Sequence, residues 1–325
     1  MRVIPPNSII SASFSQSIAD MKARATSAAQ ESVTGQHTDL TKHLGGRIGS
    51  AMTSHKALAD IANQRGLLSI RAGRLDLAQQ SLGGVQERIA GLEVRMLSAL
   101  SMGDRPGQDL VARDAEAALR DTFNALNSRH GDRFLFAGDQ TATQPLTSPD
   151  QLLADIRQIA NTATSAADFE LQLDEYFQSP TGGWLTSIYA GSATSSDPDA
   201  VTATDPAIVE VISALAVMAI STTSNNIALF DQNPDIVAAS AERIGTGSTA
   251  LVNLRADIGI SQERIAKSRE SLDTEEAILN TVFNSMVGRD QYDAASELKQ
   301  LEAGLEAAYL LTSRLSNLTL LNFLR

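Results

Sequence analysis

The residue types that usually carry chemistry are sparse in this sequence and badly spaced for it. The chain has no cysteine and four scattered histidines: His37, His43, His55 and His130. No pair of carboxylates stands at metal-ligand spacing beside them, so solvated polar side chains are the better interpretation. The sequence also has no nucleophile elbow and no convincing acid/base pair. We therefore expect neither an enzyme nor a metal site.

Two short motifs look like binding sites but lack the necessary context. The run Gly245-Thr246-Gly247-Ser248-Thr249-Ala250 has the spacing of a dinucleotide-binding fingerprint. That fingerprint requires a preceding strand, whereas residues 238–244 have a helical pattern. The sequence Asp197-Pro198-Asp199 lacks the remaining ligands of a calcium loop and is typical of a turn. We expect no cofactor, which leaves the helices as the carriers of function.

Apolar side chains at helical spacing dominate both ends of the chain. Near the C-terminus, a stripe three and four residues apart widens until the last turns are apolar nearly all round. It consists of Leu311, Leu315, Leu318, Leu321, Phe323 and Leu324. Near the N-terminus, a second stripe consists of Ile10, Phe14, Ile18 and Met21. Helices this apolar need a cover, and terminal segments fray unless they are tied down. The cover is either the opposite end of the chain, as in an ordinary core, or copies of the same chain.

Two long segments repeat an apolar residue every seven positions, which is the signature of a coiled coil. The first contains Ile61, Leu68, Leu75, Leu82, Ile89 and Met96. The second contains Val237, Ile244, Leu251, Ile258, Ile265, Leu272, Leu279 and Met286. The second seam position is mixed in the first segment, where it includes Gln64 and Arg71. A chain that runs out along one such helix and back along the other forms an antiparallel pair.

The segment between the long helices changes character. Gly103–Gly107 should break the first long helix, and a second helix is expected over 108–129. Gly131 and Asp132 then predict a turn before the aromatic run Phe134-Leu135-Phe136. Beyond residue 140 we expect a helix near 149–163, loops and short strands over 179–204, and a buried helix over 207–221.

These patterns predict a mainly α fold, an elongated antiparallel helical bundle or coiled coil built from the two halves of the chain. Residues 1–33 and 290–325 would be terminal helices that are disordered in the monomer. Residues 34–139 and 231–289 would form the coiled-coil core. Residues 140–230 would form an inserted small α+β domain.

Charge and hydropathy exclude several partners. The net charge of −12 argues against nucleic acid and against an anionic membrane surface. Residues 1–20 show no secretory signal. The longest apolar run, Ala207 to Ile220, contains Glu210 and is too short to span a bilayer. If the protein acts outside the cell, we expect export without a cleaved signal peptide.

Three stretches together resemble the flagellin superfamily, and most closely its hook-associated protein 3 class. The first is the opening Met1–Pro6 with the later run Gln30–Gln36. The second is the run Arg133-Phe134-Leu135-Phe136-Ala137-Gly138, which is similar to an aromatic motif after the family's second core helix. The third is the ending Leu315–Leu324. With the heptad segments, the resemblance covers residues 1–140 and 235–325 and leaves the middle uncovered.

The resemblance implies a structural, non-enzymatic subunit of the bacterial flagellum at the junction between hook and filament. The terminal helices would bind copies of the same chain. Further partners would be the adjoining hook-associated protein, flagellin, an export chaperone and the flagellar secretion apparatus, and the location would be extracellular. A minor filament flagellin is the alternative within this class. A cytoplasmic coiled-coil adaptor is the alternative from another class, because heptads alone fit it equally well.

Overall fold

The computed structural model describes residues 6–222 and 227–323, with side chains over 12–222 and 227–314. The fold is mainly α, as the periodicities predict. The chain divides into two compact units. The first unit contains the residues up to Arg65 and those from Glu270 onward, and the second contains Gly66–Arg269. In the described part of the chain, no helix is both long and apolar enough to cross a membrane.

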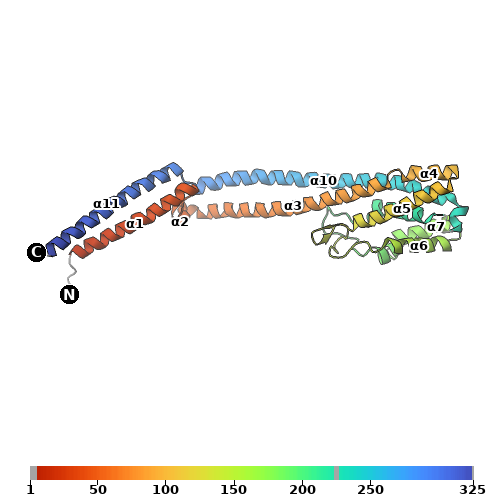
Figure 1. Ribbon diagram of the computed structural model, residues 1–325, viewed down its shortest axis with the longest axis horizontal. Helices are drawn as coiled ribbons and strands as arrows, with labels where there is room; N and C mark the ends of the chain where they lie inside the picture. The colour runs from red at the N-terminus through yellow and green to blue at the C-terminus, as the bar shows by residue number, and fades with distance from the viewer. Residues whose placement is uncertain (1–5, 223–226, 324–325) are drawn as a thin grey trace. The chain divides into compact units, whose positions relative to one another are not determined.

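In the first unit, the helices from the two ends of the chain lie side by side (Figure 1). These are α1 (Pro6–Thr34) and α11 (Gln291–Phe323). The short helices α2 (Leu40–Leu44) and η1 (Gly45–Arg47) lead from α1 into α3, which begins at Ile48. Helix α10 ends at Val287, just before α11. Both connections therefore lie in the same unit as the helices that they join.

Two small apolar clusters stabilise this unit. Ala25 and Ala28 of α1 pack with Leu301 of α11. Leu44 of α2 packs with Ala51 of α3 and Val287 of α10. Because alanines supply much of the contact, the buried apolar area is small, so hydrophobic burial stabilises the terminal pair weakly.

Five of the six heptad residues of the outgoing segment are confirmed as buried, and the sixth, Leu68, is partly buried against the core of the second unit. Helix α3 (Ile48–Ile89) buries Leu75, Leu82 and Ile89 in the second unit and Ile61 in the first. The helix was expected to run unbroken to Gly103, but it ends at Ile89 and restarts as α4 (Leu92–Met102). Gly91 explains the break, because its backbone is left-handed with φ of 73°. Met96 remains buried on the new helix.

The returning helix α10 (Pro234–Val287) carries the second heptad seam, and the seam residues become less buried toward the end of the helix. All five heptad residues from Val237 to Ile265 are buried in the second unit. The last three, Leu272, Leu279 and Met286, are only half-buried in the first unit. Here polar pairs supplement the seam, and Arg65 of α3 binds Asp273 at 3.0 Å and also Glu276.

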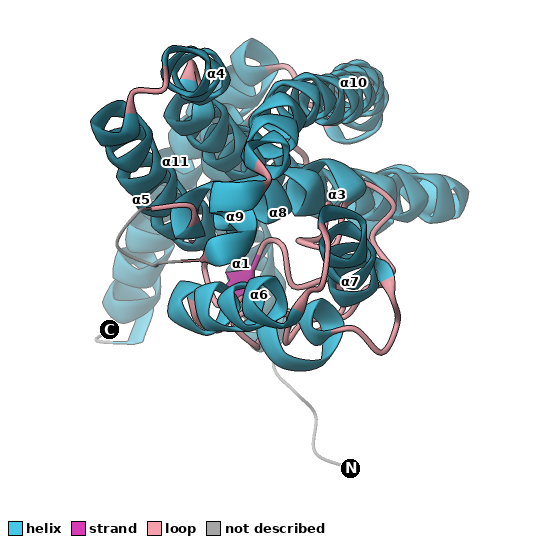
Figure 2. Cartoon of the chain, turned by 90° about the vertical axis from the view of Figure 1, so that its right-hand side faces the viewer, coloured by secondary structure: helices cyan, strands magenta, loops and turns pink. Residues whose placement is uncertain are grey.

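The middle of the chain packs into the core of the second unit. Helix α5 (Arg105–Leu126) is followed by α6 (Pro149–Thr162) and α7 (Ala166–Gln178). A π-helical turn η2 (Trp184–Ile188), helix α8 (Pro206–Ile220) and helix α9 (Ala228–Gln232) complete it. Figure 2 shows α5, α6 and α7 arranged around α8. Helix α8 buries eleven residues, so the predicted buried helix is confirmed.

Two details of the middle segment differ from expectation. Helix α7 was not predicted, although Phe169, Leu173 and Phe177 follow one another at four-residue spacing and are buried. The strands expected over 179–204 reduce to one isolated bridge, between Leu146 and Tyr189. The Ser/Thr-rich stretch instead forms loops whose side chains bond to their own backbone, as between Ser192 and Thr194. Buried side chains of residues 140–230 share one core with those of α3, α5 and α10. That this segment folds as a separate domain stays a prediction.

Candidate assembly surface on the terminal helices

The N-terminal stripe contributes first to the pair of helices within the chain. Met21 is half-buried and packs against the cluster of Ala25, Ala28 and Leu301. Its sulfur lies 3.6 Å from the position that a Cβ at Gly304 of α11 would take, so the two helices are in van der Waals contact here. Phe14 and Ile18, closer to the N-terminus, are also half-buried. These three predicted residues therefore lie along one face of α1.

The C-terminal helix exposes large apolar side chains. Tyr309, Leu310 and Leu311 keep 54%, 65% and 51% of their surface exposed, whereas the adjacent Ala308 is buried. Three large exposed side chains in succession are costly to leave in water. The predicted residue Leu311 thus belongs to a surface of α11 that nothing within the described chain covers.

Several predicted interface residues cannot be placed at the level of side chains. The backbones of Ile10, Leu315, Leu318, Leu321 and Phe323 lie in α1 and α11, but their side chains fall outside the described part. Leu324 lies beyond the described residues altogether. Their role in assembly remains a prediction from their spacing.

The aromatic motif 133–138 opens with the expected hairpin. Strand β1 (Arg129–His130) pairs antiparallel with β2 (Arg133–Phe134) around Gly131 and Asp132. The guanidinium of Arg129 lies over the Phe134 ring, 4.8 Å from its centroid, in a cation–π contact. Leu135 is partly buried, and Phe136 and Ala137 are fully buried.

The end of the motif holds the loop that precedes α8. The Phe136 carbonyl accepts a hydrogen bond from the Ala203 N–H at 3.0 Å, and the Ala137 carbonyl accepts one from Ser192 at 2.9 Å. The Tyr189 hydroxyl donates to the Ser192 carbonyl at 2.7 Å. Burial raises the pKa of Tyr189 to about 12. The described motif thus has a clear packing role in the second unit.

Gly138 closes the motif in a position that only glycine suits. Its φ is 61°, and a Cβ there would collide with the carbonyl oxygens of Ser192 and Thr194. The left-handed backbone and the close approach both exclude larger residues. This glycine therefore lets the loop reach the motif.

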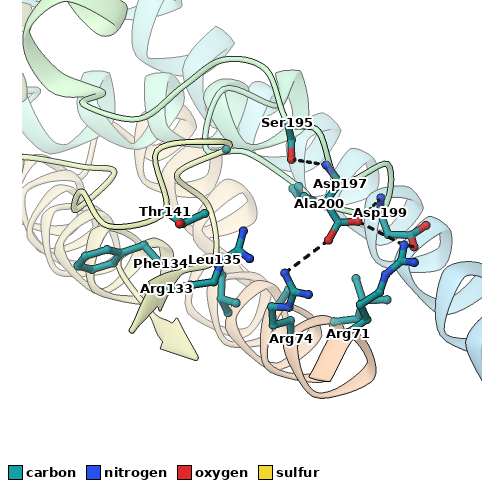
Figure 3. A pocket seen from close by; sticks show the side chains of 14 residues that line it. Arg71, Arg74, Arg133, Phe134, Leu135, Thr141, Ser195, Asp197, Asp199 and Ala200 are labelled. Atoms are coloured by element: carbon teal, nitrogen blue, oxygen red, sulfur yellow. Dashed lines mark hydrogen bonds and ion pairs between the residues drawn. The ribbon is translucent and has the colours of Figure 1, made fainter. Parts of the chain in front are cut away.

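Arg133 lines a small pocket of about 40 Å³ together with Arg71 and Arg74 (Figure 3). Asp197 and Asp199, from the loop before α8, supply the opposing charge. Asp197 accepts from Arg71 at 3.3 Å and lies 3.5 Å from Arg74, and the carboxylate of Asp199 pairs with Arg71. The predicted turn at 197–199 is confirmed, but sequence reasoning missed that its carboxylates bind arginines of α3.

The remaining motifs have structural roles. Gly245–Ala250 lies inside α10, where Gly247 allows α8 to approach at Val211. Within the described residues, no group of three His, Asp or Glu side chains is placed to hold a metal ion. His43 is exposed, as expected of a solvated side chain, whereas His37 is half-buried; the two rings stack with centroids 3.7 Å apart.

Comparison with known proteins relates the C-terminal part of the chain to a family. Residues 241–324 match the family model described as the bacterial flagellin C-terminal helical region. No curated protein matches the chain. Among solved structures, the chain is similar to FlgL of Bacillus cereus, with 12% identity and a TM-score of 0.48, over 72% of this chain and 98% of that one. The matched family segment contains most of α10 and all of α11. The stretch 241–324 is thus similar to the C-terminal helical region of bacterial flagellin.

Proposed function

We propose that this protein is a structural subunit of the bacterial flagellum that joins the hook to the filament. The observation that carries the proposal is the flagellin-type C-terminal region, whose last helix exposes Tyr309, Leu310 and Leu311. In this role the terminal helices bind copies of the same chain, repeated around an axis. The aromatic motif 133–138 supports the junction class through the resemblance described above.

The proposed role brings further partners and a location. The adjoining hook-associated protein and flagellin would bind on either side of the subunit. An export chaperone would shield α11 before the flagellar secretion apparatus exports the chain, which would then act outside the cell without loss of a signal peptide. The proposed role is structural and involves no catalysis.

A minor filament flagellin is the second candidate, because the matching family model describes flagellin itself. Immunogold labelling of intact cells separates the two functions. The junction role predicts a narrow labelled band where the filament meets the hook. Label along the whole filament would favour the flagellin role. Label confined to the cytoplasm, together with normal filaments after gene deletion, would contradict both and favour the coiled-coil adaptor.

A further inference from the structure

The two connections that lead to the terminal helices are hydrogen-bonded to each other. The N–H of His37 donates to the Val287 carbonyl at 2.9 Å, and the N–H of Arg289 donates to the Gly35 carbonyl at 2.8 Å. Gln36 and Gly288 thereby form an isolated antiparallel bridge. All of these residues belong to the first unit. A change in the conformation of one connection therefore alters the hydrogen bonds of the other.

Glu31, at the end of α1, is the buried centre of a charge network around this bridge. The residue is only 7% exposed. Its carboxylate accepts a hydrogen bond from the Thr38 N–H at 2.9 Å. The same carboxylate forms an ion pair with Arg289 Nε at 3.2 Å. Arg289 also binds Glu297 of α11, which accepts from Arg24 of α1 at 2.8 Å. Opposite charges thus alternate from α1 through the connection to α11 and back to α1.

A stacked pair of histidines lies against this network. The His37 and His43 rings are 3.7 Å apart and inclined by 20°. His37 Nδ1 lies 3.8 Å from Glu31 Oε1, and His43 Nε2 lies 3.2 Å from the Met286 carbonyl. Both rings line a groove of about 380 Å³. The other charged groups that line it are Arg24, Glu31, Asp39, Lys42, Arg289 and Glu297.

The surroundings of His37 favour its neutral form. Burial and the neighbouring His43 lower its pKa from the usual 6.5, and Arg289 adds to this, while Glu31 opposes it. A histidine whose pKa is lower in the folded state stabilises that state above pH 6.5, and this contribution is lost as the pH falls through the folded pKa. Protonation also places a second cation beside Arg289, where the two compete for Glu31.

We propose that Glu31, Arg289, His37 and His43 form a pH-sensitive clasp, which holds α1 against α11 when His37 is neutral and loosens them when it is protonated. The apolar contact between the helices, through Ala25, Ala28 and Leu301, is small in area and makes the pair dependent on such a clasp. Acidification would release both connections together, because they share hydrogen bonds. The clasp is a property of the single chain, so its failure would leave the flagellar proposal standing, and the reverse also holds.

The absence of cysteine in the chain allows a direct test by spin labelling. Thr26→Cys on α1 and Lys299→Cys on α11 place labels at two exposed positions. The label-to-label distance distribution is measured on dilute, monomeric full-length protein from about pH 7.5 to about pH 5. In place of terminal helices that are disordered in the monomer, the clasp predicts a narrow distribution at the higher pH that broadens with a midpoint below pH 6.5. A distribution that is the same at every pH would overturn the proposal.

Three variants in the labelled background identify the groups responsible. His37→Gln removes the titrating ring and should keep the distribution narrow throughout. Glu31→Gln removes the charge that binds Arg289 and should broaden the distribution even at the higher pH. His55→Gln is the matched control, since His55 lies in the same unit against Phe283, and it should leave the midpoint unchanged. A His37→Gln protein that still broadens, or a Glu31→Gln protein that stays narrow with unchanged helical content, would contradict the clasp.

Discussion

The guanidinium of Arg71 pairs with the largely buried carboxylate of Asp199, so a loop from the middle of the chain neutralises a charge on the coiled-coil seam. Arg71 occupies a seam position of α3 between Leu68 and Leu75. Arg264 of α10 reaches the same carboxylate at 3.6 Å. The loop therefore binds both long helices of the second unit where an apolar seam residue is missing.

Removing this carboxylate should destabilise the second unit. Asp199→Asn removes the charge that pairs with Arg71 and Arg264 and leaves Arg71 only its longer contact with Asp197. Because Arg71 is partly exposed, we expect a loss of about 1–3 kcal/mol in the free energy of unfolding. Urea denaturation followed by circular dichroism measures the loss. The matched control is Glu263→Gln, which breaks the exposed pair with Lys267 and should change the free energy of unfolding much less than Asp199→Asn does.

A compensating pair sharpens this prediction. Arg71→Leu combined with Asp199→Ala removes both charges, so the double variant should be more stable than Asp199→Asn alone. Equal losses for Asp199→Asn and Glu263→Gln would show that the Asp199 pair contributes no more than an exposed one.

Gly138 offers a second test, on the aromatic motif. Gly138→Ala should destabilise the protein by about 2–4 kcal/mol, because a left-handed backbone and two carbonyl oxygens both oppose the new Cβ. Gly131→Ala is the control, because its φ is also 61° but the space around it is open. We expect that variant to lose only about 1 kcal/mol. Thermal unfolding of the two proteins decides the point, and similar losses would argue against close packing of the loop on Gly138.

The buried tyrosine predicts a loss of stability in alkali. The pKa of Tyr189 is raised from 10.0 to about 12, so the folded state holds its proton after the unfolded state has released it. Stability from this group is complete below pH 10.0 and is lost as the pH rises toward 12. Denaturant midpoints measured across this range should fall less steeply in Tyr189→Phe than in the wild type. Parallel slopes for the two proteins would exclude this linkage.

Local pattern predicted most of the helices and much of the core. The seven-residue period identified Leu82 and Leu251 as core residues because a coiled coil needs only neighbouring turns to define its face. The hairpin around Gly131 and the buried helix α8 (Pro206–Ile220) also followed from local signals. The break at Gly91 was missed because a single glycine lowers helix propensity by only about 1 kcal/mol.

Contacts between distant segments were beyond the reach of the sequence. Nothing in Asp197-Pro198-Asp199 points to Arg71, since the pairing depends on how the loop folds back onto α3. The stacking of His37 on His43 likewise depends on the turn into α2. By contrast, the exposure of Leu311 agrees with the spacing argument, which predicts an apolar stripe on this helix that needs a cover.

The central claim, that apolar side chains at the end of α11 join copies of this chain, is tested most directly by replacing two of them with charges. The measurement is sedimentation velocity of the wild type and of Leu310→Glu/Leu311→Glu across a range of concentrations, with electron microscopy of the concentrated samples. Exposed Glu302→Gln on the same helix is the control. We predict ordered assemblies for the wild type and the control, and a monomer with unchanged helical content for the double variant. At concentrations low enough for the wild type to be monomeric, the two proteins should share one unfolding midpoint. A wild type that stays monomeric at every concentration, or a double variant that assembles as the wild type does, would contradict the account.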